Sequence, residues 1–162
     1  MSIDFDDARF TAVGLFTEAF VGLSSKFAAD FDRYGVSAVE FEVLMRLARS
    51  PGNQLRMTDL AAQTTLSTSG VTRVVDRMER DGLVARRACP TDRRSSYATV
   101  TEAGLAKLNE ILPGHLDLID RWFVGQFSPE QLDELLSALR VLRDAVNPCA
   151  TVGTSEPVVP AS

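Results

Sequence analysis

The sequence predicts a mainly α-helical protein that contains one short β-hairpin. Apolar residues recur at spacings of three and four along most of the chain, as in helices that bury one face. Only the segments 83–88 and 96–101 are short, include β-branched residues and flank a polar stretch, which favours a hairpin. The length of 162 residues is typical of one domain.

The first predicted element is a long helix from Phe5 to Arg33, ended by Tyr34 and Gly35. Its apolar stripe is formed by Phe16, Phe20, Leu23, Phe27 and Phe31. Glycines at 14 and 22 each cost a helix about 1 kcal/mol relative to alanine, so this helix depends on packing. The aromatic stripe fits either the core of the same chain or a partner chain.

Two shorter helices follow. Ser37 is expected to cap a helix that runs to about Arg49 and ends in the turn Ser50–Asn53. Thr58 is expected to cap the next helix, which ends near Gln63. A short turn at 64–66 leads into the element that carries most of the functional signal.

That element is a helix with two chemically different sides, capped by Ser67 or Thr68 and ended by Gly82. One side is apolar and carries Val71, Val74, Val75 and Met78. The other carries hydroxyl groups and charges, namely Ser69, Thr72, Arg73, Asp76, Arg77 and Arg80. Two helices joined by a short turn, the second exposing hydroxyls and arginines, form a helix-turn-helix that places its second helix in a DNA major groove.

The hairpin that follows has a long basic tip over residues 89–95. A hairpin directly after a helix-turn-helix is a wing, and the arrangement is then a winged helix. An arginine at the tip can reach the adjacent minor groove, whose narrow form attracts guanidinium groups. Arg94 is the first candidate for that role.

Two helices complete the predicted fold. The first opens at Thr101 and continues to about Phe127, with an interruption and a kink at Pro113. The second begins with Ser128 as its cap and runs to Val146. The tail 149–162 is rich in small and polar residues and is expected to be disordered.

The charge is distributed unevenly. The whole chain carries a net charge of -5, which by itself argues against a polyanionic partner. The segment from Arg46 to Tyr97, however, contains ten arginines and five acidic residues, which gives it a net charge of +5. The rest of the chain therefore has a net charge of -10. Arginine grips phosphate oxygens and guanine edges with a planar fork of donors. On composition alone a solvated charged surface is the preferred explanation, so the spacing of the residues must distinguish it from a polyanion site.

Four motifs occur in order: MTDLA at 57–61, STSGVTRVVDRMERDGLV at 67–84, DRR at 92–94 and VTEAG at 100–104. Together they resemble the MarR family of bacterial transcriptional regulators, over residues 10–146. The resemblance implies a single domain at 1–148, with a winged helix at 38–101 and a dimerisation lobe built from helices at 5–34 and 102–147. It also implies a homodimer with its two recognition helices in successive major grooves.

Carried over position by position, the resemblance assigns DNA contacts to residues of the recognition helix and the wing. Arg94 corresponds to the arginine inserted in the minor groove, and Asp92 to the carboxylate that orients it, although Asp92 can also be a simple turn residue. The candidate DNA-binding residues are Ser67, Thr68, Ser69, Thr72, Arg73, Arg77, Asp92, Arg93 and Arg94.

The expected function is therefore that of a sequence-specific regulator of double-stranded DNA, a ligand-responsive repressor acting as a homodimer on a pseudo-palindromic operator. The resemblance implies a small phenolic or anionic effector, and neither a cofactor nor a metal is expected. Trp122 lies outside the first helix, and that helix has no cysteine. The urate-responsive and peroxide-sensing branches of the family are therefore not supported.

The sequence also bears on three other functions. Redox sensing through Cys89 is the main alternative, because the arginines of the wing favour a thiolate. An enzyme is not indicated, because His115 is the only histidine and neither G-x-G-x-x-G nor G-x-S-x-G occurs. A winged helix that binds protein is disfavoured by the arginine-rich face. The acidic N-terminus and the lack of a long apolar run predict a cytoplasmic protein without a membrane span.

Overall fold

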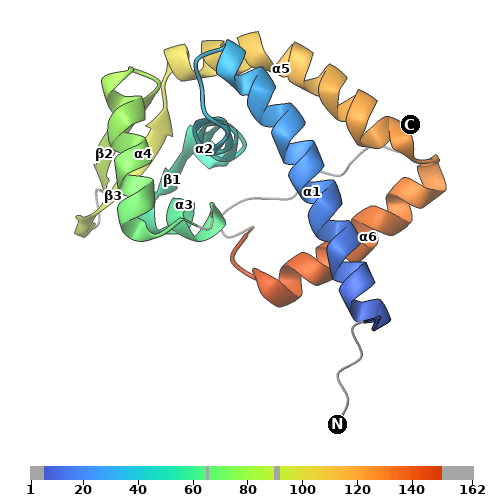
Figure 1. Ribbon diagram of the computed structural model, residues 1–162. Helices are drawn as coiled ribbons and strands as arrows, with labels where there is room; N and C mark the ends of the chain where they lie inside the picture. Colours follow the sequence, from blue (N-terminus) through green and yellow to red (C-terminus); the bar gives the residue numbers. More distant parts are fainter. Residues whose placement is uncertain (1–5, 65, 90–91, 151–162) are drawn as a thin grey trace.

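The computed structural model describes residues 6–64, 66–89 and 92–150 (Figure 1). Its helices and strands occur in the order α1 (Ala8–Arg33), α2 (Ala38–Ala48), β1 (Gln54–Arg56), α3 (Met57–Gln63), α4 (Thr68–Arg80), β2 (Val84–Cys89), β3 (Asp92–Val100), α5 (Glu102–Trp122) and α6 (Pro129–Val146). Short 3-10 turns precede β1 (η1, Pro51–Asn53) and α6 (η2, Val124–Gln126). The predicted mainly helical fold with a small antiparallel sheet is confirmed.

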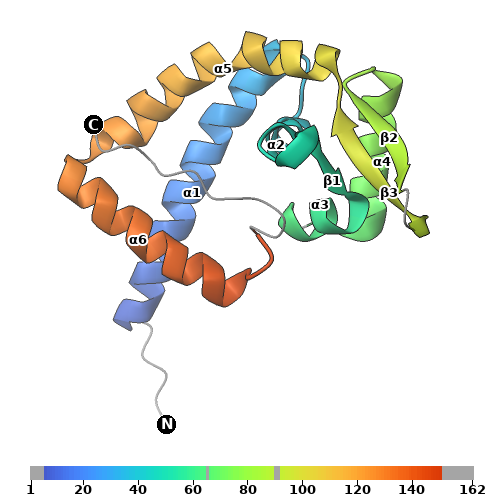
Figure 2. The ribbon, with the colours of Figure 1, turned by 180° about the vertical axis from the view of Figure 1, so that it is seen from behind.

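The elements form two lobes. Helices α2, α3 and α4 lie with the three strands at one end of the molecule, while α1, the far part of α5 and α6 lie at the other (Figures 1 and 2). Helix α5 starts at the end of β3 and extends into the second lobe, so it belongs to both. We call these parts the winged lobe and the helical lobe.

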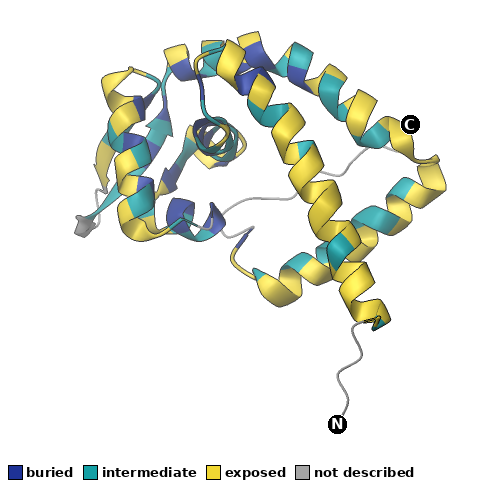
Figure 3. Cartoon of the chain, viewed as in Figure 1, coloured by how far each residue is buried: buried dark blue, intermediate teal, exposed yellow. Residues whose placement is uncertain are grey.

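The winged lobe contains most of the buried core (Figure 3). Its fully buried side chains come from α2, α3, α4 and the sheet, and they include Leu44, Leu47, Leu60, Val71, Val75, Met78 and Val84. In contrast, no residue of α6 is buried, and α1 buries only Asp30 and Phe31. The winged lobe therefore has a core of its own, whereas the helical lobe leaves apolar surface uncovered.

The sheet has the strand order β1-β3-β2, and both pairings are antiparallel. Strand β1 was not predicted. It has only three residues, but its central Leu55 pairs with Ala98 and both are buried. Three residues are too few to show an alternating pattern, and only the pairing with β3 makes this segment a strand.

Four predicted helix starts are confirmed by their caps. The side chains of Ser37, Ser67, Thr101 and Ser128 each accept a hydrogen bond from a backbone N–H in the first turn of the following helix. The predicted cap at Thr58 is wrong. Helix α3 begins at Met57, because the chain enters it directly from β1 and Arg56 occupies the capping position without a side-chain bond.

Other boundaries also differ from the prediction. Strand β3 starts at Asp92, so residues 92–95 continue the strand and are not a loop. Helix α5 continues through Pro113, which lies on the exposed side, where water can reach the carbonyl that loses its donor. It ends at Trp122 and not near Phe127, because η2 follows.

The structure describes only part of the two predicted chain ends. Residue 5, the predicted start of the first helix, and residues 151–162 of the predicted disordered tail lie outside the described residues. Within the described part of the tail, Ala150 is buried and its carbonyl accepts a hydrogen bond from Arg46 Nη1 at 2.7 Å. No helix in the described ranges is both long and apolar enough to cross a bilayer.

One close contact fixes α5 on the winged lobe. Thr101 donates from its backbone N–H to the Leu83 carbonyl at 3.1 Å and from its hydroxyl to the Gly82 carbonyl at 2.6 Å. Gly104 lies one turn later against the same segment, and a Cβ there would meet the Leu83 carbonyl oxygen at 2.2 Å. The motifs at 81–84 and 100–104 are therefore two halves of one packing contact.

Candidate nucleic-acid interface

The recognition helix α4 has one side in the core and one side in solvent, with Val74 of the predicted apolar side only partly buried. Val71, Val75 and Met78 are fully buried in the winged lobe. On the opposite side, the candidate residues Ser67, Thr68, Ser69, Thr72 and Arg73 are all exposed. The apolar side is thus fixed by the core, and the predicted polar side faces solvent.

The N-terminal turn of α4 presents short hydroxyl side chains close to the backbone. Ser67 Oγ accepts from the Gly70 N–H at 3.0 Å and lies 3.1 Å from Ser69 Oγ. Thr72 donates its hydroxyl to the Thr68 carbonyl at 2.8 Å. Hydroxyls held in this way can approach a phosphate or a base edge closely, and the positive end of the helix dipole favours an anion at the same place.

Arg73 is an exposed cation on this surface. In the part of the chain that the structure describes, no ion pair or hydrogen bond holds its guanidinium group. Its five donors are therefore available to a polyanion.

Arg77 is arranged differently. Its Nε donates to Glu40 Oε1 at 2.6 Å, so the side chain is tied to the start of α2. Glu40 is only 7% exposed, and its other oxygen accepts from the N–H and the hydroxyl of Ser37 at 2.8 and 2.7 Å. Burial by itself would raise the pKa of Glu40, but the hydrogen bonds from Ser37 and Arg77 outweigh it and the pKa is lowered.

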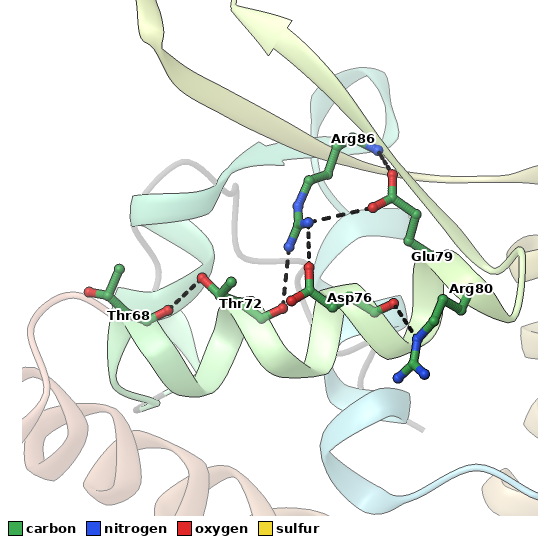
Figure 4. Close-up of polar contacts among 6 residues, drawn as sticks. All are labelled: Thr68, Thr72, Asp76, Glu79, Arg80 and Arg86. Carbon is green, nitrogen blue, oxygen red and sulfur yellow. Dashed lines mark hydrogen bonds and ion pairs between the residues drawn. The ribbon is translucent and has the colours of Figure 1, made fainter.

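Arg86 on β2 is a site residue that sequence reasoning missed (Figure 4). Its Nη1 contacts Asp76 Oδ1 and Glu79 Oε2, and its Nη2 donates to the Thr72 carbonyl at 3.2 Å. The Arg86 backbone N–H also donates to Glu79 Oε1 at 3.0 Å. The sequence signal that could have revealed this role is the pair Asp76 and Glu79, three residues apart on a basic helix. Two such acids call for a cationic partner on a neighbouring element.

The tip of the wing lies at the limit of the described structure. The backbone pairs Cys89 with Asp92, and the register shifts between Ala88 and Cys89. The side chains of Cys89, Asp92, Arg93 and Arg94 lie outside the described residues. Their predicted roles, including redox sensing by Cys89, therefore remain predictions.

His115 lies at the junction of the two lobes, among Phe27 and Phe31 of α1 and Phe41 of α2. The ring centroids are 4.7–4.8 Å from that of the imidazole, and His115 is only 6% exposed. Burial lowers the pKa of His115, and the nearby Asp30 carboxylate opposes this effect only in part. This lone histidine is therefore packed among aromatic side chains.

This environment predicts a pH effect on stability. The unfolded chain gains a proton at His115 below about pH 6.5, whereas the folded protein resists protonation because its pKa is lower. The unfolded state then binds more protons, so the free energy of unfolding falls as the pH decreases from about 6.5 toward the folded pKa. Urea unfolding between pH 7.5 and 5 measures this loss, and His115→Gln should flatten that part of the profile. A profile identical to that of the wild type would contradict the assignment.

The helical lobe presents a large uncovered apolar surface. Exposed apolar side chains of α1, α5 and α6 include Phe10, Val13, Phe16, Phe20, Val21, Leu116, Val141, Leu142 and Val146. A groove of about 640 Å³ lies between α1 and α6. Its walls are mostly apolar, with Phe16 and Phe20 facing Leu136, Leu139 and Leu142, and Arg49, Arg140 and Arg143 also line it.

Comparisons with known proteins agree with this geometry. A family model described as "MarR family" matches residues 34–95. The uncharacterized HTH-type transcriptional regulator YkoM of Bacillus subtilis is 34% identical over 126 residues, which cover 78% of this chain and 80% of YkoM.

Two solved structures of MarR family transcriptional regulators from Streptomyces coelicolor are also similar. AbsC has a TM-score of 0.84 and 31% identity, covering 91% of this chain and 99% of AbsC. Sco3205, solved in complex with DNA, has a TM-score of 0.82 and 30% identity, covering 91% of this chain and 93% of Sco3205. The motifs, the winged lobe and these relatives together show that the chain belongs to the MarR family of transcriptional regulators.

Proposed function

We propose that this protein is a sequence-specific repressor that binds double-stranded DNA as a homodimer. The observation that carries the proposal is the exposed face of α4, where hydroxyls and Arg73, which has no partner among the described residues, lie opposite the buried Val71, Val75 and Met78. A helix of this kind can enter a major groove while the core holds it from behind. Sco3205, which has the same fold and 30% identity, was solved in complex with DNA.

In this proposal the contacts come from two elements. Ser67, Thr68, Ser69, Thr72 and Arg73 of α4 contact bases and phosphates in the major groove. The wing residues Asp92, Arg93 and Arg94 serve the adjacent minor groove, with Asp92 orienting Arg94. The net charge of +5 between Arg46 and Tyr97, against -10 elsewhere, turns this face of the protein toward the DNA.

The homodimer is supported by the uncovered surface of the helical lobe. Helix α6 is amphipathic and none of its residues is buried, although it carries Leu132, Leu135, Leu136, Leu139 and Leu142. Exposed apolar patches of this extent mark interfaces. We assign this surface to a second copy of the chain, which would place two α4 helices about 34–36 Å apart on a pseudo-palindromic operator.

An effector is the third part of the proposal. In this proposal the second copy covers the leucines of the groove between α1 and α6, and the part lined by Arg49, Arg140 and Arg143 is left to a small phenolic or anionic molecule. Arg49 ends α2 in the winged lobe, whereas Arg140 and Arg143 belong to α6. A bound anion would therefore bridge the two lobes, and its effect on DNA binding is limited by its differential affinity for their two spacings.

Selection of bound duplexes from a random pool tests this function. We expect enrichment of a pseudo-palindrome whose half-sites lie about one helical turn apart. Repeating the selection with salicylate, a phenolic carboxylate, tests the effector class and should reduce the enrichment. Failure to enrich any sequence would favour a winged helix that binds protein.

Replacement of Arg73 by alanine tests the contact surface directly. The plot of log affinity against log salt should become less steep by about 1.8, because the homodimer loses one phosphate contact in each subunit. Fluorescence anisotropy between 50 and 200 mM NaCl measures this slope. Arg9→Ala, which removes an exposed arginine at the far end of α1, is the control and should leave the slope unchanged. An unchanged slope in Arg73→Ala would remove Arg73 from the interface.

A further inference from the structure

We infer that Arg86 and Arg77 are positioning residues that set the rotation of α4 about its axis, and thereby its choice of bases, without contacting DNA. The inference rests on the proposed function and deepens it. We call the contacts of these two arginines with Thr72, Asp76, Glu79 and Glu40 the α4 clamp.

The Arg86 arm joins the wing to the recognition helix. Arg86 contacts α4 at Thr72, Asp76 and Glu79, three positions on adjacent turns of one side of the helix (Figure 4). The Arg86 side chain is 28% exposed, whereas Asp76 and Glu79 are 48% and 41% exposed, so the pairs lie at the edge of the protein surface. With both terminal nitrogens engaged, this side chain acts as a brace between β2 and α4.

The Arg77 arm joins the same helix to α2. Arg77 follows Asp76 directly in the helix. The contact of Asp76 with Arg86 and the contact of Arg77 with Glu40 therefore start from positions about 100° apart around the axis of α4. Glu40, which receives Arg77, is itself fixed by its bonds to Ser37 at the start of α2. A roll of α4 in either direction must lengthen one of the two arms.

A small roll matters at the DNA surface. At a side-chain radius of about 5–6 Å, a rotation of about 10° moves the tips of exposed side chains by about 1 Å. Hydrogen bonds to base edges tolerate a spread of only about 0.5 Å in length. The clamp therefore acts on discrimination between sequences more than on total affinity, which phosphate contacts dominate.

The acids of the clamp support this interpretation. Asp76 and Glu79 place negative charge on the helix that approaches DNA, where carboxylates oppose binding electrostatically. Their contacts with Arg86 give them a structural role. Simple electrostatics and the clamp therefore make opposite predictions for their removal.

The test compares Asp76→Asn with Asp81→Asn. Both variants remove one negative charge near α4, but only Asp76 contacts Arg86. The measurement is the ratio of the dissociation constants for scrambled duplex and for the duplex enriched by selection. We expect this ratio to fall about tenfold in Asp76→Asn, the cost of about one lost base contact, and to stay near the wild-type value in Asp81→Asn. Asp76→Glu keeps the carboxylate and should restore part of the discrimination.

Several results would overturn the inference. Equal ratios in Asp76→Asn and Asp81→Asn would show that only charge matters. A plot of log affinity against log salt that becomes less steep by about 1.8 in the Arg86→Gln homodimer would show that Arg86 contacts a phosphate in each subunit. Thermal unfolding of each variant verifies that it is folded at the temperature of the measurement. If the wild type binds no duplex, the proposed function fails and the inference fails with it. If the wild type binds specifically and Asp76→Asn distinguishes the enriched duplex from scrambled duplex equally well, only the inference is refuted.

Discussion

Replacement of Leu139 by aspartate is expected to convert the protein into monomers and to weaken binding to the selected operator by about 100-fold or more. Leu139 lines the groove between α1 and α6, on the apolar face that we assign to a second copy. A carboxylate on this apolar face would lose its hydration against a second copy, which costs several kcal/mol. A monomer then loses the gain from binding two linked half-sites, typically a factor of about 10²–10⁴.

Sedimentation at micromolar protein concentration and anisotropy titrations measure the two effects. Ser137→Asp is the matched control, because it introduces the same charge on the exposed side of the same helix. This control should remain dimeric and bind the operator as the wild type does. A dimeric Leu139→Asp protein with unchanged affinity would place the interface elsewhere.

The second large effect concerns Gly104. Substitution by alanine is expected to lower the free energy of unfolding by about 3 kcal/mol, at the upper end for overpacking. The added Cβ would lie 2.2 Å from the Leu83 carbonyl oxygen and 2.6 Å from Val100 Cγ2. The first of these is a backbone atom that cannot move without shifting the turn into β2. For a chain of this size the melting temperature should fall by roughly 6–12 °C.

Gly22→Ala provides the opposite control for that experiment. Gly22 lies inside α1 with nothing within 4 Å of an added Cβ, so alanine should stabilise the protein by about 0.5–1 kcal/mol. Thermal unfolding at one fixed protein concentration compares the three proteins, because the stability of a dimer depends on concentration. A Gly104→Ala protein as stable as the wild type would show that the start of α5 is free to move away from Leu83.

Much of the candidate interface could be predicted from local sequence signals. The buried side of α4 follows from apolar residues at helical spacing, and Ser67 follows from the preference for hydroxyls at a helix start. Arg77 shows the limit of this reasoning. Its helical position was predicted correctly, but its partner Glu40 is 37 residues away and only the packing of α2 on α4 brings the two together.

The pairing of Arg86 also could not be predicted from its local sequence. Within its own segment it is one of two adjacent arginines in a strand, and nothing local distinguishes Arg86 from Arg87. The hairpin register turns Arg86 toward Asp76 and Glu79, while Arg87 is exposed. The role of each arginine therefore depends on which side of the strand faces the helix.

The sequence by itself determined the order of the helices, the helix-turn-helix, the wing and the family, because periodicity, caps and turn residues act over a few neighbouring positions. Only the tertiary structure decided that Arg77 and Arg86 are paired, why Gly104 has no side chain, and that a three-residue segment joins the sheet. These features depend on contacts between residues far apart in the chain. Local patterns carry no information about such contacts until the core has placed the elements against each other.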